Sequence, residues 1–236
     1  MNTLKHIVLI GVGLIGGSFV LDLKRLGLVD TVTGIDLDRD NLDRALERRV
    51  IDRAYTQIDA LSMHEADLAV IATPVSTFPD ICRTVRPYLN AHTVVTDVGS
   101  TKQSAVQAFR SVLPEHLSRC IAAHPIAGSD RSGALSAQFG LFQDRKLVIT
   151  PHGDEDEQAV SLVENLWLAV GAQTFRMSAE EHDAVFAAVS HMPHLVAFAY
   201  VHQIADHPDG RRYLEFAATG FRDFTRIASS HPAVWT

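Results

Sequence analysis

Residues 5–18 read KHIVLIGVGLIGGS, and this stretch decides the fold. An apolar run, residues 7–10, ends at three glycines with the spacing G-x-G-x-x-G, namely Gly11, Gly13 and Gly16. The run predicts a buried strand, and the residues after it predict a helix. In such a turn the first glycine permits a sharp bend, the second lets the backbone approach a pyrophosphate, and the third lets the helix pack close to the strand. The helix N-terminus then offers N–H groups and a partial positive charge to phosphates.

A carboxylate at the end of the next predicted strand, residues 31–36, narrows the choice of nucleotide. Asp36 is placed to accept hydrogen bonds from a ribose 2′-hydroxyl and to repel a 2′-phosphate, which favours NAD over NADP. The alternative is that Asp36 only caps the helix that follows. A further contact is expected where strand 67–72 ends. The predicted cofactor-binding residues are Gly11, Gly13, Leu14, Ile15, Gly16, Asp36, Thr73 and Pro74.

Composition excludes several classes of protein. The chain has 236 residues, 47% hydrophobic residues and a formal net charge of -7, so nothing indicates binding to nucleic acid or to an anionic membrane. Cys82 and Cys120 match no metal or redox spacing, and we expect reduced thiols in a cytoplasmic protein. The N-terminal apolar run is too short and too rich in glycine for a signal peptide, and no uninterrupted apolar run approaches the roughly 18 residues of a membrane helix. With this net charge, an anionic substrate needs locally placed arginines.

The first three-quarters of the chain alternates strand and helix patterns. This alternation predicts an α/β fold with a doubly wound, mostly parallel Rossmann-type sheet covered by helices on both faces. The expected strands are 5–10, 31–36, 67–72, 93–97, 119–123, 146–150 and 172–176, with a weaker one at 53–56. The expected helices are 14–26, 38–48, 76–89, 101–112 and 155–170.

The pattern changes after Arg176. Ser178 and Glu181 have capping-box spacing and predict the start of a long helix that ends near residue 205. A turn at 207–210 and a second helix at 211–229, with a break near Gly220, complete this part. We therefore predict a nucleotide-binding domain at 1–176 and an all-helical segment at 177–236. A segment this small is expected to pack on the first domain or on a second subunit.

Two polar residues follow predicted strands at the edge of the sheet where open α/β sheets bind ligands. His124 follows strand 119–123, and because a histidine titrates near neutral pH, it is the candidate acid or base. Ser100 follows strand 93–97 and is a candidate ligand contact. The alternatives are a surface histidine, in a chain that has 12, and a serine that only caps the next helix.

The helical segment offers further polar candidates. Pro193 lies inside the first predicted helix, where it removes a hydrogen bond and predicts a kink. His191 and His194 flank it, and without a third clustered ligand we interpret them as polar lining of a cleft and predict no metal. In the second helix, Arg226 is a candidate carboxylate clamp, because guanidinium binds carboxylate bidentately. Asp223 is spaced to pair with Arg226; the alternative is an ordinary surface ion pair.

In order along the chain, five motifs together resemble the prephenate and arogenate dehydrogenases of tyrosine biosynthesis. The resemblance covers essentially the whole chain, and the ordered set of the last four motifs is specific. The motifs are the glycine turn at 11–18, DVGSTK at 97–102, HPIAGS at 124–129, SHMPH at 190–194 and GFRDFTR at 220–226. Members of the family usually continue beyond the position of Trp235, so the resemblance implies either that segment 177–236 is incomplete or that this chain is a shortened member.

The resemblance implies an NAD-dependent oxidative decarboxylation that yields an aromatic ring. His124 would hydrogen-bond the ring hydroxyl and take up its proton, with Ser100 in support. Arg226, held by Asp223, would bind a substrate carboxylate. The remaining substrate-cleft residues implied by the resemblance are Ser129, Ser190, His194 and Trp235. It also implies a homodimer formed through the helical segment, and prephenate and arogenate both remain open as substrates.

The sequence is also compatible with two other kinds of protein. A β-hydroxyacid dehydrogenase shares this architecture but relies on a lysine in the helix after the crossover, and residues 178–205 contain no lysine. The second alternative belongs to another class: a protein that binds or senses NAD without catalysis. Production of NADH from prephenate or arogenate discriminates between these readings and the dehydrogenase.

Overall fold

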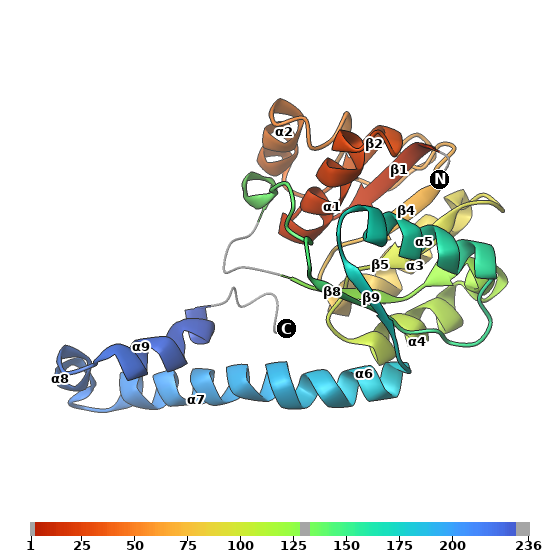
Figure 1. Ribbon diagram of the computed structural model, residues 1–236. Helices are drawn as coiled ribbons and strands as arrows, with labels where there is room; N and C mark the ends of the chain where they lie inside the picture. The colour runs from red at the N-terminus through yellow and green to blue at the C-terminus, as the bar shows by residue number, and fades with distance from the viewer. Residues whose placement is uncertain (1–2, 128–132, 230–236) are drawn as a thin grey trace. The chain divides into compact units, whose positions relative to one another are not determined.

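The computed structural model describes residues 3–127 and 133–229. The chain divides into two compact units, Met1–His182 and Asp183–Thr236, and each is described by itself (Figure 1). The first unit contains a six-stranded sheet whose order is β3-β2-β1-β4-β5-β6. All five pairings in this sheet are parallel, and β1 and β4 are neighbours at the point where the strand order reverses. The predicted Rossmann-type architecture is confirmed.

The strands and helices of this layer match the expected pattern closely. The strands are β1 (Leu4–Ile10), β2 (Val29–Ile35), β3 (Arg53–Tyr55), β4 (Leu68–Ile71), β5 (Val94–Asp97) and β6 (Cys120–Ile121). The helices are α1 (Leu14–Arg25), α2 (Arg39–Glu47), α3 (Phe78–Val85), α4 (Lys102–Val112) and α5 (Glu157–Ala169). The single helix predicted at 76–89 is wrong in detail, because α3 lies between two 3-10 turns, 75–77 and 86–88.

Alternation along β1 explains why helices cover both faces of the sheet. Ile7 and Leu9 belong to an apolar core shared with α1, α2 and α5. Val8 and Ile10 belong to a second core shared with α3 and α4. Successive side chains of a strand point to opposite faces, so a strand buried on both sides must be apolar throughout. β1 therefore lies at the centre of a doubly wound sheet.

One predicted strand is divided between two sheets. The run expected as strand 119–123 ends in the large sheet as β6, and the chain continues as β7 (Ala123–Ile126) in a second sheet. This sheet has the order β7-β8-β9, with β8 at Lys146–Ile149 and β9 at Gln173–Arg176. β7 pairs antiparallel with β8, and β8 pairs parallel with β9. The expectation that these strands extend one parallel sheet is wrong.

The helix predicted from residue 178 is not regular. It consists of α6 (Ala179–Phe186), a π-helical turn at 187–191 and α7 (Met192–Asp206). The Ser178 hydroxyl accepts a hydrogen bond from the Glu181 N–H at 3.1 Å, as the capping box predicts. The π-helical turn ends two residues before Pro193, where an α-helix loses an N–H donor, so it is the irregularity at which the missing bond is accommodated.

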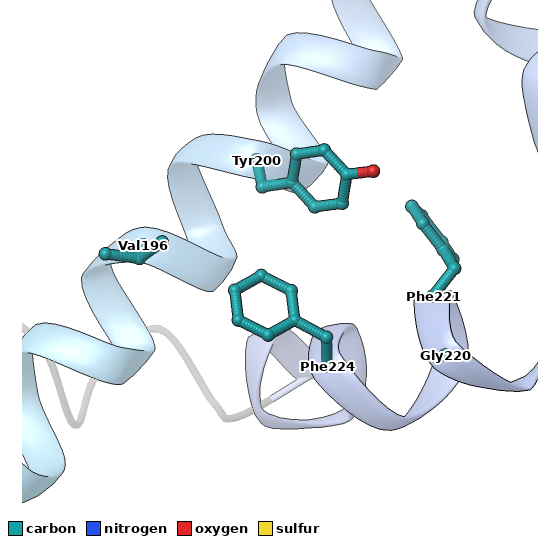
Figure 2. A pocket seen from close by; sticks show the side chains of 5 residues that line it. All are labelled: Val196, Tyr200, Gly220, Phe221 and Phe224. Carbon is teal, nitrogen blue, oxygen red and sulfur yellow. The ribbon is translucent and has the colours of Figure 1, made fainter.

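The second unit is made of helices that contact α7. The predicted second helix is α8 (Gly210–Glu215), α9 (Thr219–Thr225) and a 3-10 turn at 226–229, so it is interrupted at 216–218, close to Gly220 as predicted. Rings from α7 and α9 gather around an open apolar hollow, which Figure 2 shows from close by. The ring centroid of Tyr200 lies 5.6 Å from that of Phe221 and 5.9 Å from that of Phe224.

Candidate active site

The glycine turn has the geometry that a dinucleotide requires. Gly11 has a φ of 89°, and a Cβ there would lie 2.6 Å from the Ala72 carbonyl oxygen. A Cβ on Gly16 would lie 2.5 Å from Leu9 Cδ1. A Cβ on Gly13, in contrast, would meet nothing within 4 Å. Two glycines are therefore required by the fold itself, whereas Gly13 borders open space where a ligand backbone can approach.

The N-terminus of α1 is suited to an anion. Its N-cap is Gly13, with no side-chain cap and no acidic residue in the first turn. Leu14 and Ile15, predicted as cofactor contacts, form the first positions of α1, where backbone N–H groups lack partners within the helix. Such a terminus favours a phosphate through its N–H groups and the helix dipole.

Asp36 joins the glycine turn to the second strand. Its Oδ2 accepts hydrogen bonds from the Val12 N–H at 3.0 Å and from the Asn41 amide at 3.1 Å. Its Oδ1 accepts from the Asp38 N–H at 3.0 Å. The cap of α2 is Asp38, whose side chain accepts from the N–H groups of residues 40 and 41, so the alternative that Asp36 is the helix cap is wrong. Asp36 is half-buried and stands beside the turn that the pyrophosphate would occupy.

Thr73 and Pro74 lie at the carboxyl end of β4, next to the glycine turn. The Ala72 N–H donates to the Ile10 carbonyl at 2.7 Å, which holds the two strand ends together. The hydroxyls of Thr73 and Thr77 are 2.8 Å apart, and Thr77 also bonds the Pro74 carbonyl. The predicted contacts from β1 and β4 therefore lie together at the point where the strand order reverses, which is the ligand-binding position of such sheets.

A buried ion pair connects the segments that carry Ser100 and His124. Lys102 bonds Asp97 Oδ2, and both side chains are fully buried. Lys102 Nζ also donates to the Ala123 carbonyl at 2.6 Å, while Asp97 Oδ1 accepts from the Ala123 N–H at 3.2 Å. Burial raises the pKa of the Asp97 carboxyl, and the Lys102 ammonium opposes that shift. The pair thus fixes the residue before His124 against the end of β5.

Ser100 does not cap α4, so the alternative interpretation of this serine as a helix cap is wrong. The N-cap of α4 is Thr101, and no side-chain hydrogen bond caps this helix. The Gly99 N–H donates to Asp97 Oδ2 at 2.8 Å, which anchors the turn that presents Ser100. Ser100 is half-buried, and its role at a ligand site stays a prediction.

His124 lies on β7 and contacts a residue that the sequence analysis missed. Its Nδ1 is 2.8 Å from Nε2 of His182, and the two rings meet edge to face with centroids 5.0 Å apart. His124 is half-buried and His182 is fully buried. Among 12 histidines, His182 had only one signal in the sequence: it lies four residues after Ser178, in the first turn of the helix that follows β9.

The remaining predicted residues belong to the second unit or lie outside the described residues. Ser190 and His194 are one turn apart, and the His194 Nδ1 lies 2.9 Å from the Ser190 carbonyl. Arg226 begins the 3-10 turn after α9 and is exposed. No ion pair joins it to Asp223 within the described residues, so that support stays a prediction. Ser129 and Trp235 lie outside the described residues.

Metal binding finds no support in the described part of the chain. No group of three or more His, Cys, Asp or Glu side chains gathers there in a way that could hold an ion.

A parallel sheet with a glycine turn at its switch point defines a dinucleotide-binding domain, and in this chain a helical segment follows it. The chain belongs to the prephenate dehydrogenase family. Residues 19–176 match the family model "Prephenate dehydrogenase, nucleotide-binding domain", and residues 178–236 match "Prephenate dehydrogenase, dimerization domain". The proposed resemblance is confirmed.

Individual relatives agree with this assignment. The chain is 40% identical to a prephenate dehydrogenase of Bacillus subtilis over its whole length and spans 64% of that protein. It is 32% identical to a cyclohexadienyl dehydrogenase of Zymomonas mobilis, of which it spans 80%. The crystal structure of prephenate dehydrogenase from A. aeolicus with hydroxyphenyl propionate and NAD+ superimposes with a TM-score of 0.91 at 33% identity, covering 99% of this chain and 81% of that one.

Proposed function

We propose that this chain catalyses the NAD-dependent oxidative decarboxylation of prephenate to 4-hydroxyphenylpyruvate. The observation that carries the proposal is the placement of His124 on the short strand beside the end of β5, tied to it by the buried Asp97–Lys102 pair. Family membership supplies the substrate class, since the relatives named above are prephenate and cyclohexadienyl dehydrogenases.

The residues present fit NAD. Gly13 leaves room for a pyrophosphate, the α1 N-terminus has no competing side chain, and Asp36 stands where a ribose 2′-hydroxyl would donate to it. A carboxylate at that position disfavours the 2′-phosphate of NADP. Bound NAD would accept the hydride from the ring carbon that carries the hydroxyl.

The chain's own residues would manage charge and position. His124 would accept the proton of the substrate hydroxyl as the ring carbonyl forms. Ser100 would support this step by positioning the substrate hydroxyl and the His124 imidazole relative to each other. Arg226 would bind a substrate carboxylate, which a protein with a net charge of -7 must attract locally. Loss of carbon dioxide from the opposite ring carbon makes the ring aromatic, so positioning is the main requirement once hydride transfer begins. We assign Ser129, Ser190, His194 and Trp235 to the substrate cleft, and retain 1–176 and 177–236 as the functional division.

Arogenate is the second candidate substrate, because one of the relatives is a cyclohexadienyl dehydrogenase. The two substrates differ at one side-chain carbon, which bears a keto group in prephenate and an amino group in arogenate. The test is the formation of NADH by the purified chain with each substrate. We expect kcat/KM to be higher with prephenate. A higher value with arogenate would reverse the substrate assignment, and NAD binding without NADH formation from either substrate would leave an NAD-binding protein instead.

We further propose that the helical segment forms a homodimer. In the described residues, one helical stretch, Ala179–Asp206, is long and apolar enough to cross a membrane by length and composition. Its apolar window has a mean hydropathy of 1.5 and is only 6% buried. Val189 and Leu195 are 67% and 61% exposed. Since residues 178–236 match a dimerization domain, a second copy of this chain is the partner that fits this surface. We also propose that the protein is cytoplasmic, as the two cysteines without metal or redox spacing led us to expect.

The oligomeric state tests this part of the proposal. Light scattering after size exclusion should give a dimer for the unaltered chain and a monomer for Leu195→Glu. Leu37→Glu is the matched control, because Leu37 is 93% exposed but lies in the first unit, and it should remain dimeric. A monomer for the unaltered chain, or a dimer for Leu195→Glu, would contradict the assignment.

A further inference from the structure

The contact between His124 and His182 calls for a function, because the only side chain that α6 buries fully is a polar one. His182 is the one buried residue of this helix, and it is fully buried. A helix that packs for stability alone presents an apolar stripe to the core. Here the buried group is a polar ring whose Nε2 lies 2.8 Å from His124 Nδ1.

The small sheet places both rings. In β7–β8 pairing, His124 is opposite Val148. In β8–β9 pairing, Ile149 is opposite Arg176, and the Met177 N–H then donates to the Ile149 carbonyl at 3.3 Å. The chain enters α6 directly after this bond. β8 therefore sets the position of His124 on one side and the start of the His182 helix on the other.

The first turn of α6 is itself held. The Ser178 hydroxyl accepts from the Glu181 N–H, and the Ser178 carbonyl accepts from the His182 N–H at 2.9 Å. The backbone that carries the His182 ring is thus held by a capped helix start. Positioning groups of this kind act by fixing the tautomer and direction of the ring that they contact.

A hydrogen bond between two neutral imidazoles has one donor and one acceptor, so the pair has two arrangements. If His182 donates, His124 carries its own proton on Nε2, and Nε2 cannot accept another. If His124 donates from Nδ1, its Nε2 is the basic nitrogen. Two imidazolium rings at this distance would both be donors and would repel each other.

We propose that His182 is a positioning residue that accepts the Nδ1 proton of His124 and thereby makes Nε2 of His124 the nitrogen that accepts the substrate hydroxyl proton. The inference rests on the proposed function, in which His124 is the base. When the hydroxyl proton reaches Nε2, the His124 imidazolium keeps its Nδ1–H bond to neutral His182. The proton stays on His124 until solvent removes it, and no other group changes its protonation.

Two substitutions separate acceptance of the proton from mere packing. His182→Phe keeps an aromatic ring but has no acceptor, whereas His182→Gln offers an amide oxygen near the position of Nε2. We expect His182→Phe to lower kcat about 100-fold with KM changed by less than about threefold, and His182→Gln to recover most of that loss. Glu181→Gln, an exposed position on the same helix, is the control and should match the unaltered chain. Equal kcat values for the Phe and Gln variants would overturn the proposal.

A double substitution and a spectroscopic readout complete the test. In the His124→Asn background, His182→Phe should lower kcat no further, because its effect passes through His124; an independent second loss would indicate a structural role. Nitrogen-15 NMR of the unaltered chain should show His124 protonated on Nδ1, and protonation on Nε2 would refute the inference even if His182→Phe fails to fold. If the unaltered chain forms no NADH from either substrate, the proposed function fails, whereas the NMR result is read independently of turnover.

Discussion

Removing Lys102 should destabilise the first unit by about 3–5 kcal/mol, because it leaves Asp97 charged and buried without its cation. In Lys102→Met, the carboxylate keeps the N–H groups of Gly99 and Ala123, and the Ala123 carbonyl loses its bond from Nζ. Replacing both partners is expected to cost less than the sum of the single changes by about 2 kcal/mol, since no lone buried charge remains. The matched variants are Lys102→Met, Asp97→Asn and the two combined.

The destabilisation should also depend on pH, with a definite sign. Burial already raises the pKa of the Asp97 carboxyl, and Lys102 is the group that most strongly opposes the shift. Without Lys102 the folded-state pKa rises further above the unfolded value. A carboxyl whose pKa is raised in the folded state stabilises that state at low pH, and this stability is lost as the pH rises toward the folded-state pKa. The free energy of unfolding of Lys102→Met should therefore fall further below that of the unaltered chain at about pH 8 than at about pH 5.5. The extra loss is about 1.4 kcal/mol for each pH unit that lies between the unfolded-state and folded-state pKa values of Asp97.

Urea unfolding followed by tryptophan fluorescence measures these free energies. Trp167 is fully buried in the first unit and stacks on Phe19, with ring centroids 4.1 Å apart. A Trp235→Phe background leaves Trp167 as the sole tryptophan, since the chain has 2. A loss below about 1 kcal/mol in Lys102→Met, strict additivity of the pair, or a destabilisation that shrinks as the pH rises would refute this account of the buried pair.

Three further outcomes are expected. Gly16→Ala should destabilise the fold by about 1–3 kcal/mol through its clash with the core, whereas Gly13→Ala should leave stability nearly unchanged and weaken NAD binding at least about tenfold by calorimetry; the reverse pattern would contradict the roles given to the glycine turn. His124→Asn should lower kcat far more than it changes KM, and Arg226→Ala should chiefly raise KM. Steady-state kinetics measure both effects, and the reverse pattern would contradict the roles given to the two residues. Asp36→Ala should narrow the preference for NAD over NADP in kcat/KM, and an unchanged preference would remove Asp36 from ribose recognition.

The sequence was most informative at positions where only one residue type meets the physical requirement of the fold. The crowding at Gly11 and Gly16 follows directly from the spacing of the glycine turn, and the strands of the large sheet follow from apolar runs between helical patterns. Apolar runs do not specify strand direction or partner, however. For that reason the change of sheet between Ile121 and Ala123, and the antiparallel pairing of β7 with β8, were not predictable.

Residues of the candidate site could be predicted only where their position in the local sequence indicated a role. His124 and Ser100 were found from their positions after predicted strands, although the structure places His124 within β7. His182 was missed because its significance comes from a contact across 58 residues of sequence, and its one local signal, a place four residues after the helix-capping Ser178, does not indicate that contact. The π-helical turn before Pro193 was likewise out of reach, because a proline inside a helical pattern predicts an irregularity without specifying its form.

Product stoichiometry tests the central claim most directly. Purified chain incubated with NAD and prephenate should release carbon dioxide, NADH and 4-hydroxyphenylpyruvate in equal amounts, and His124→Asn should form all three at a rate lowered at least about 100-fold. NADH without matching carbon dioxide would show a simple alcohol oxidation, and bound NAD with no products from prephenate or arogenate would contradict the enzymatic function altogether.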